Sequence, residues 1–151
     1  MKRIFALCAL ALAPAAAAPA GLFAARICAP DQYSVYVNDK AQKWMPTLKA
    51  DLSRQLQTLS KAYRLNEPCS SGDAVKFRYL LIANATDPIA GGGRGYVVHL
   101  AVTEPDAGFT AYYDFTVGVA SGTATNTRVV ILGSARELID EFAVAYSDAN
   151  P

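Results

Sequence analysis

The sequence contains few of the residues from which catalytic and metal-binding centres are built. Among its 151 residues there are one histidine and three cysteines, and the cysteines form no Cys-x-x-Cys motif. A single histidine without clustered carboxylates supplies the ligands of neither a zinc site nor a calcium loop. We therefore expect no metal and no cofactor, and the missing motif argues against a redox or metal-binding role for the cysteines.

The sequence also lacks an excess of charge of either sign. It has 14 lysine and arginine residues against 13 aspartate and glutamate residues, which gives a formal net charge of +1. A balanced charge provides no general attraction to nucleic acid or to an anionic membrane. We therefore expect neither as a partner on grounds of charge.

No apolar run reaches the roughly 20 residues that a transmembrane helix needs. The run at residues 4–12 has instead the features of a secretory signal peptide, since Lys2 and Arg3 precede it, Pro14 follows it, and Ala18-Pro19-Ala20 forms a small-x-small cleavage pattern. We expect residues 1–20 to be removed and residues 21–151 to form one exported domain without a membrane span, periplasmic or secreted.

Removal of the signal peptide also removes Cys8 and leaves Cys28 and Cys69. In an oxidising compartment an even pair of cysteines is most simply a disulfide. This bridge would close a loop of about 40 residues and contribute roughly 4 kcal/mol in the chain-entropy model. The sequence therefore predicts a Cys28–Cys69 disulfide that stabilises the domain.

Two helical segments are indicated by apolar spacing. Leucines and a tyrosine recur every three or four residues from Leu48 to Tyr63, which predicts one long amphipathic helix that starts or bends near Pro46. Ser134 and Glu137 form a Ser-x-x-Glu capping box that predicts the start of a C-terminal helix. Spacing places Tyr63 in the core.

Four strands are expected at 76–84, 96–104, 109–119 and 128–132, with an optional short strand at 33–37. In the 109–119 segment, Tyr113 and its apolar neighbours at alternate positions share one face, which favours a core position for Tyr113. The order of elements predicts an α+β fold with two layers, an antiparallel four-strand meander with two helices packed on one face.

Two motifs that suggest catalysis or phosphate binding are incomplete. The stretch Gly91-Gly92-Gly93-Arg94-Gly95 leads into a strand rather than a helix and has no Walker lysine, so we expect a flexible hairpin loop, from which Arg94 could contact a partner. Ser134 follows Gly133, but the sequence does not complete Gly-x-Ser-x-Gly.

Two groups of polar residues are candidates for binding. If the strand 96–104 buries its even-numbered residues, His99 lies on the open sheet face, where neighbouring strands could add Arg78, Tyr112 and Asp114. Such a group offers a cation, a titratable ring, a phenol and a carboxylate. Ordinary solvated strand residues explain the same pattern.

The second group is a basic face of the long helix. Lys43, Arg54 and Lys61 lie within about 20° of one another on a helical projection. This face could dock an anionic envelope polymer or an acidic protein patch, although every amphipathic helix needs a solvated outer face. Because no aromatic residues flank it for base stacking, we expect no nucleic acid there.

The layout of signal segment, helix, antiparallel strands and terminal amphipathic helix resembles that of uncharacterised small exported bacterial proteins. The similarity is carried most specifically by the C-terminal residues Glu137-Leu138-Ile139-Asp140-Glu141-Phe142 through Ala149-Asn150-Pro151. This resemblance implies no particular activity.

Three hypotheses follow for the function. The leading one is a non-enzymatic exported or envelope-associated binding protein that uses the open sheet face or a strand edge for an unidentified protein or envelope polymer. The second is a small periplasmic enzyme in which His99 works with Asp114 or Tyr112, which requires these side chains within hydrogen-bond reach. The third, by fold analogy, is an inhibitor or ligand carrier with a cystatin-like helix-on-sheet layout.

Overall fold

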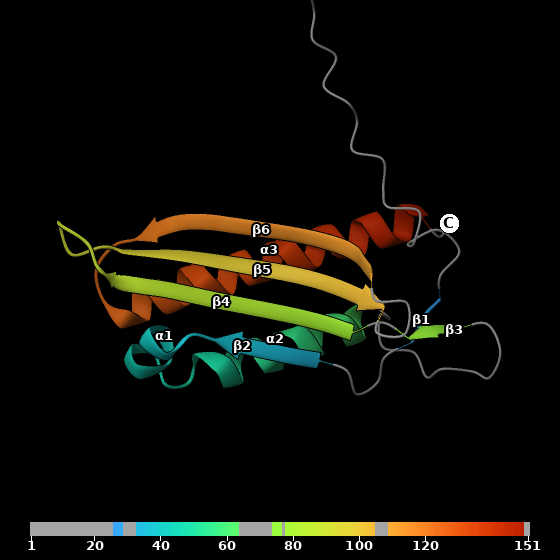
Figure 1. Ribbon diagram of the computed structural model, residues 1–151, viewed down its shortest axis with the longest axis horizontal. Helices are drawn as coiled ribbons and strands as arrows, with labels where there is room; N and C mark the ends of the chain where they lie inside the picture. The colour runs from blue at the N-terminus through green and yellow to red at the C-terminus, as the bar shows by residue number, and fades with distance from the viewer. Residues whose placement is uncertain (1–25, 29–32, 64–73, 77, 105–108, 150–151) are drawn as a thin grey trace, which may run out of the picture.

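The computed structural model describes residues 26–28, 33–63, 74–76, 78–104 and 109–149 (Figure 1). The strands of its four-stranded sheet lie in front of its two longer helices in the view of Figure 1, so this part of the molecule has one helical layer and one sheet layer. In chain order the elements are β1 (Arg26–Cys28), β2 (Tyr33–Val37), α1 (Asp39–Trp44), α2 (Leu48–Ala62), β3 (Ala74–Lys76), β4 (Arg78–Pro88), β5 (Arg94–Glu104), β6 (Phe109–Ala120) and α3 (Ala124–Ala149).

The main sheet has the strand order β2-β4-β5-β6. β4, β5 and β6 form an antiparallel meander, whereas β2 lies parallel to β4. The α+β prediction is confirmed, and the optional strand at 33–37 is present. The sheet is mixed rather than wholly antiparallel. Between β2 and β4, the helices α1 and α2 return the chain toward the end of the sheet at which β2 began, so β4 runs in the same direction as β2. β1 and β3 form a separate parallel pair.

The strand expected at 128–132 is wrong, because these residues belong to the 26-residue helix α3. Neighbouring Val129 and Val130 suggested a strand, but they are exposed on one side of a helix. The opposite side is buried from Thr127 to Ala143, at positions that include Ile131 and Leu138. A continuous helical stripe of burial therefore outweighs the local β propensity of two valines.

The helix α3 begins well before the expected capping box. The Thr123 side chain accepts a hydrogen bond from the Asn126 N–H at 3.3 Å, after a turn at Gly122 with φ of 89°. Ser134 is buried inside the helix, where its Oγ lies 3.4 Å from the Tyr96 hydroxyl. The capping role predicted for Ser134 is therefore wrong.

The predicted long helix is divided into α1 and α2 by a break that contains Pro46. Asn38 begins α1 by accepting a hydrogen bond from the Ala41 N–H at 3.0 Å, and it also bonds both backbone groups of Ala85 in β4. The leucine stripe of α2 is buried as expected. Tyr63 is not in the core, since it follows the end of α2, is 41% exposed and donates to Asp140 at 2.6 Å.

The core lies between the sheet and the helices α2 and α3. Tyr79 of β4 is buried there, and its ring meets that of Phe142 of α3 edge-on at 5.8 Å. None of the described helices is both long and apolar enough to cross a membrane.

Candidate functional site

The sheet has one face covered by helices and one open face. On β4 the buried side chains include Tyr79 and Leu81, and on β5 they include Val98 and Leu100, so the residues between them point to the other side. We call this other side the open face. Its side chains include Ser34, Tyr36, Arg78, Leu80, Ile82, Asn84, Val97, His99, Ala101, Thr103, Thr110, Tyr113, Phe115, Val117 and Val119.

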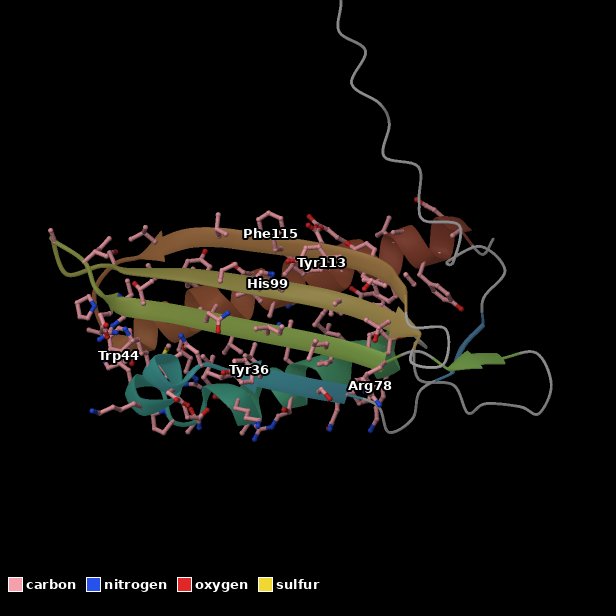
Figure 2. The ribbon with its side chains drawn as sticks, viewed as in Figure 1. Tyr36, Trp44, Arg78, His99, Tyr113 and Phe115 are labelled. Atoms are coloured by element: carbon pink, nitrogen blue, oxygen red, sulfur yellow. The ribbon has the colours of Figure 1, made fainter. Side chains whose placement is uncertain are left out.

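One row of the open face crosses all four strands. Tyr36 of β2 lies opposite Ile82 of β4, which lies opposite His99 of β5, which lies opposite Phe115 of β6. Figure 2 shows Tyr36, His99 and Phe115 on their separate strands, with Tyr113 beside His99. The sheet therefore gathers aromatic rings from β2, β5 and β6 on one surface.

The centre of this surface is a cluster of three rings. The His99 Nδ1 lies 2.6 Å from the Tyr113 hydroxyl, a hydrogen bond in which either group can donate. The ring centroids of His99, Tyr113 and Phe115 lie 5.8 to 6.1 Å apart. The arrangement offers a mostly apolar contact surface in which the His99 Nδ1 and the Tyr113 hydroxyl are hydrogen-bonded to each other.

The apolar side of β6 faces solvent, which is the reverse of the expected core position. Tyr113 and Phe115 are 55% and 53% exposed, and Val117 and Val119 are each 63% exposed. The register shifts at Ala111, which stands as one extra residue between the Val102–Tyr112 and Thr103–Thr110 pairs. A bulge of one residue reverses which side of a strand is covered. The placement of Tyr113 in the core was therefore wrong.

Tyr112 and Asp114 lie on the helix-facing side and do not join His99. Asp114 accepts hydrogen bonds from the Tyr112 hydroxyl at 3.3 Å and from the Phe115 N–H at 2.7 Å. Burial, followed by the nearby Asp114 charge, raises the pKa of Tyr112. The expected grouping of these residues with His99 is wrong. His99 lies opposite Phe115, so the neighbouring Asp114 points to the other side of the sheet. The enzyme hypothesis thereby loses its proposed pairs.

Arg78 and Arg94 have different surroundings. Arg78 is exposed at the start of β4, at a corner of the open face (Figure 2). The Arg94 guanidinium lies 3.7 Å from the centroid of the Trp44 ring and donates to the Thr86 carbonyl at 2.8 Å. Arg94 thus connects the β4–β5 hairpin to α1.

The glycine-rich stretch forms the hairpin loop that the sequence predicted. The Ile89 N–H donates to the Gly93 carbonyl at 2.8 Å, and Gly91 and Gly92 have φ angles of 93° and 82°. Positive φ values of this kind favour glycine. The loop joins two strands, so it does not place its amides at the start of a helix as a phosphate-binding loop does.

The three residues of the predicted basic face do not lie on one helix. Lys43 belongs to α1, whereas Arg54 and Lys61 belong to α2 beyond the Pro46 break. All three are exposed. Arg54 lines a groove between α2 and α3 together with Arg128 and other α3 residues. The sequence did not reveal this grouping, because residues 128–132 were expected to form a strand.

Two predictions concern residues that the structure does not describe, or describes only in part. Residues 1–20 and Cys69 are not among the described residues, and only the backbone of Cys28 is described, in β1. The signal peptide and the Cys28–Cys69 disulfide therefore stay predictions. Among the described residues, no group of three or more histidine, cysteine, aspartate or glutamate side chains could hold a metal.

No protein-family model matches the chain, and no curated protein sequence matches it either. Solved structures are similar at low sequence identity. A minor lipoprotein from Acinetobacter baumannii is 13% identical over 78% of this chain and 93% of that chain, with a TM-score of 0.47. The PelC dodecamer from Paraburkholderia phytofirmans is 12% identical over 76% and 86%, with a TM-score of 0.40. The hypothetical protein CT253 from Chlamydia trachomatis is 12% identical over 80% and 96%, with a TM-score of 0.42. These similarities assign no function to the chain.

Proposed function

We propose that the chain is an exported, non-enzymatic binding protein of the cell envelope that associates with a second copy of itself through the open face. The observation that carries this proposal is the row of apolar side chains on β6, from Tyr113 to Val119, each more than half exposed. The predicted signal peptide supports export.

The composition of the open face favours an apolar partner. Arg78 is the one formally charged side chain among the residues that define this face, and it lies at a corner. Antiparallel sheets that face water on one side usually alternate apolar and polar side chains, with the polar ones outward. A large exposed apolar patch is typical of an interaction surface.

The edge of the sheet at β6 is protected by the bulge at Ala111 rather than by length or composition. This strand is 12 residues long and contains neither proline nor lysine. Natural edge strands are commonly short or carry proline or lysine. The Asp114 side chain accepts from the Phe115 N–H, so it blocks one backbone donor of this strand. Apolar contact through the face is therefore favoured over pairing along the edge at this point.

The size and charge of the face fit a second copy. Strands about 4.8 Å apart with a rise of about 3.3 Å per residue, five residues in β2 and 11 to 12 in the other three, give a face of roughly 600 Å². This approaches the roughly 800 Å² per partner of a standard interface. Two sheets that pack face to face bury their apolar side chains in a layer about 10 Å thick. A two-fold axis along or across the strands would keep the two Arg78 side chains at different corners.

A lipid surface is a poorer occupant than a second copy. Proteins that lie on membranes combine an apolar face with lysine and arginine residues that contact anionic lipid. The open face contributes only Arg78, and the sequence has nearly equal numbers of acidic and basic residues. Charge therefore favours a neutral partner.

Sedimentation of the exported, processed protein tests this proposal. The variant Phe115→Thr/Val117→Thr removes apolar surface from the face and keeps residues with high β propensity. The control Val129→Thr/Val144→Thr changes two valines of α3 that are 62% and 61% exposed. We expect the wild type and the control to form a dimer with a Kd in the micromolar range, about −8 kcal/mol, and the open-face variant to be a folded monomer.

Two results would overturn the proposal. One is a wild-type protein that stays monomeric at concentrations far above the micromolar range. The other is a monomer that floats with vesicles of phosphatidylethanolamine and phosphatidylglycerol, with flotation lost in Phe115→Thr/Val117→Thr, which would assign the face to lipid.

A further inference from the structure

The helical layer contains a groove lined by side chains of two helices. It lies between α2 and α3 and has a volume of about 460 Å³. Leu59 of α2 and Leu132 of α3 contribute apolar surface to it. This volume falls within the range of about 300–1,000 Å³ that is usual for sites of small molecules.

Three guanidinium groups and one carboxylate line the groove. Arg54 comes from α2, Arg128 and Arg136 come from α3, and Asp51 is the carboxylate. Asp51 is held by Arg128, whose Nε and Nη2 lie 2.9 and 2.8 Å from one carboxylate oxygen. Because this pair is neutral together, Arg54 and Arg136 leave an excess of two positive charges in the lining.

Among the described residues, Arg54 and Arg136 form only long, exposed ion pairs. The Arg54 side chain is 78% exposed and approaches Asp51 no closer than 3.9 Å. The Arg136 side chain is 67% exposed and lies 3.5 Å from Asp140, whose other oxygen accepts from Tyr63. Exposed ion pairs of this length contribute little. Both guanidinium groups can therefore turn toward an anion in the groove.

Gly133 keeps the groove open on the α3 side. A Cβ atom built on this residue would have no heavy atom within 4 Å, so packing does not require glycine here. Glycine inside a helix is less favourable than alanine by about 1 kcal/mol. No neighbouring atom explains why a glycine stands here despite this cost. The missing side chain leaves open space between Arg128 and Arg136 in the groove.

We propose that this groove binds a small amphipathic anion, with a phosphate or carboxylate head between Arg54 and Arg136 and an apolar body against Leu59 and Leu132. Arginine binds such heads with two parallel hydrogen bonds. The proposal does not depend on the open face, which lies on the other side of the sheet.

Calorimetric titration of the exported protein with octyl phosphate, below the concentration at which it forms micelles, tests this site. We expect Arg54→Gln and Arg136→Gln each to weaken binding about tenfold or more, as the loss of a charged hydrogen bond does. Lys43→Gln and Lys61→Gln remove the same charge outside the groove and should leave binding unchanged. Inorganic phosphate should bind more weakly, and octyltrimethylammonium should not bind.

Substitutions of Gly133 separate the groove from general electrostatics. Gly133→Leu fills the open space without a change in charge and should abolish binding, whereas Gly133→Ala should preserve it. Both residues favour a helix more than glycine does, and circular dichroism checks that the fold is intact. The open-face variant Phe115→Thr/Val117→Thr should bind octyl phosphate like the wild type.

Three outcomes would overturn the proposal. Equal losses in the lysine and arginine variants would indicate non-specific attraction. Equal affinity for inorganic phosphate would show that the apolar walls contribute nothing and that free phosphate is the ligand. Unchanged binding by a folded Gly133→Leu variant would place the anion elsewhere.

Discussion

At the scale of single residues, the hydrogen bond between His99 and Tyr113 has the largest consequence for the proposed interface. The two side chains are polar groups on a surface that is otherwise mostly apolar, and their atoms lie 2.6 Å apart. A polar group that is buried without a partner destabilises a complex. Because the Nδ1 and the hydroxyl pair with each other, a second copy can cover these two atoms without leaving either unpaired, and the His99 Nε2 then needs a partner at the rim or on the other copy.

Tyr113→Phe should weaken self-association by about 1–3 kcal/mol, because it leaves a polar atom of His99 unpaired under the second copy. The double variant His99→Phe/Tyr113→Phe should recover most of the affinity, since it removes both partners. Sedimentation equilibrium measures both changes. Equal dimer affinity in Tyr113→Phe and the wild type would show that the face stays in water.

Glu141 of α3 gives a prediction about pH. Loss of some of its solvation next to the protein raises the pKa of this carboxyl, and a hydrogen bond with Asp114 and the charges of Asp114 and Glu137 add to the effect. Between its ordinary and its raised pKa, the folded protein holds a proton that the unfolded chain has released. The free energy of unfolding therefore decreases as pH rises through this window.

Glu141→Gln should increase the free energy of unfolding at pH 7 and flatten its decrease above pH 4.5, the ordinary pKa of this group. The effect should be small, since Glu141 is exposed to solvent. Urea denaturation across this pH range measures it, with Asp148→Asn in the same helix as the control. An unchanged pH profile in Glu141→Gln would contradict the assignment.

At the scale of elements, the sequence predicts helices and turns better than it predicts which face of an element is buried. The leucine stripe of α2 and the hairpin between β4 and β5 follow from apolar spacing and from glycine, and both are confirmed. The orientation of β6 depends on one extra residue, Ala111, whose effect the alternation of the sequence does not reveal. The helix α3 was missed in part because Val129 and Val130 suggest a strand when tertiary burial is unknown.

The candidate sites show the same limit. His99 and Arg78 are on the open face as predicted, because the alternation of β4 and β5 is regular. Tyr112 and Asp114 are not on the open face, because the bulge in β6 turns their side chains to the helix-facing side of the sheet. The groove could not be predicted, since Arg128 and Gly133 face α2 only when residues 124–149 form a helix.

Gly118 of β6 tests how tightly this strand packs on the helix-facing side. A Cβ atom at this position would lie 2.7 Å from the Tyr96 hydroxyl oxygen and 2.9 Å from two carbon atoms of its ring. Gly118→Ala should therefore decrease the free energy of unfolding by about 1–3 kcal/mol, as overpacked substitutions do.

Gly133→Ala is the matched control for this prediction. It replaces a glycine whose added Cβ meets nothing within 4 Å, and it should increase the free energy of unfolding by about 0.5–1 kcal/mol. Urea denaturation measures both variants. A Gly118→Ala protein as stable as the wild type would show that Tyr96 moves aside at little cost.

At the scale of the whole molecule, the two layers separate two surfaces with different chemistry. The sheet presents an apolar face with one charged residue at its corner, and the helical layer presents a groove with three arginines. A second copy on the first surface would leave the groove accessible on each protomer. The protein would then be a dimer that displays two anion sites on its outer sides.

The central claim is that two copies meet through their open faces, and intermolecular NOEs in a mixed sample of labelled and unlabelled protein test it most directly. The two-fold arrangement predicts NOEs from the Phe115 ring and the Val117 methyl groups to open-face residues of the other copy. Their absence in a sample that sedimentation shows to be dimeric, or NOEs only from Val129 and Val144 of α3, would contradict it.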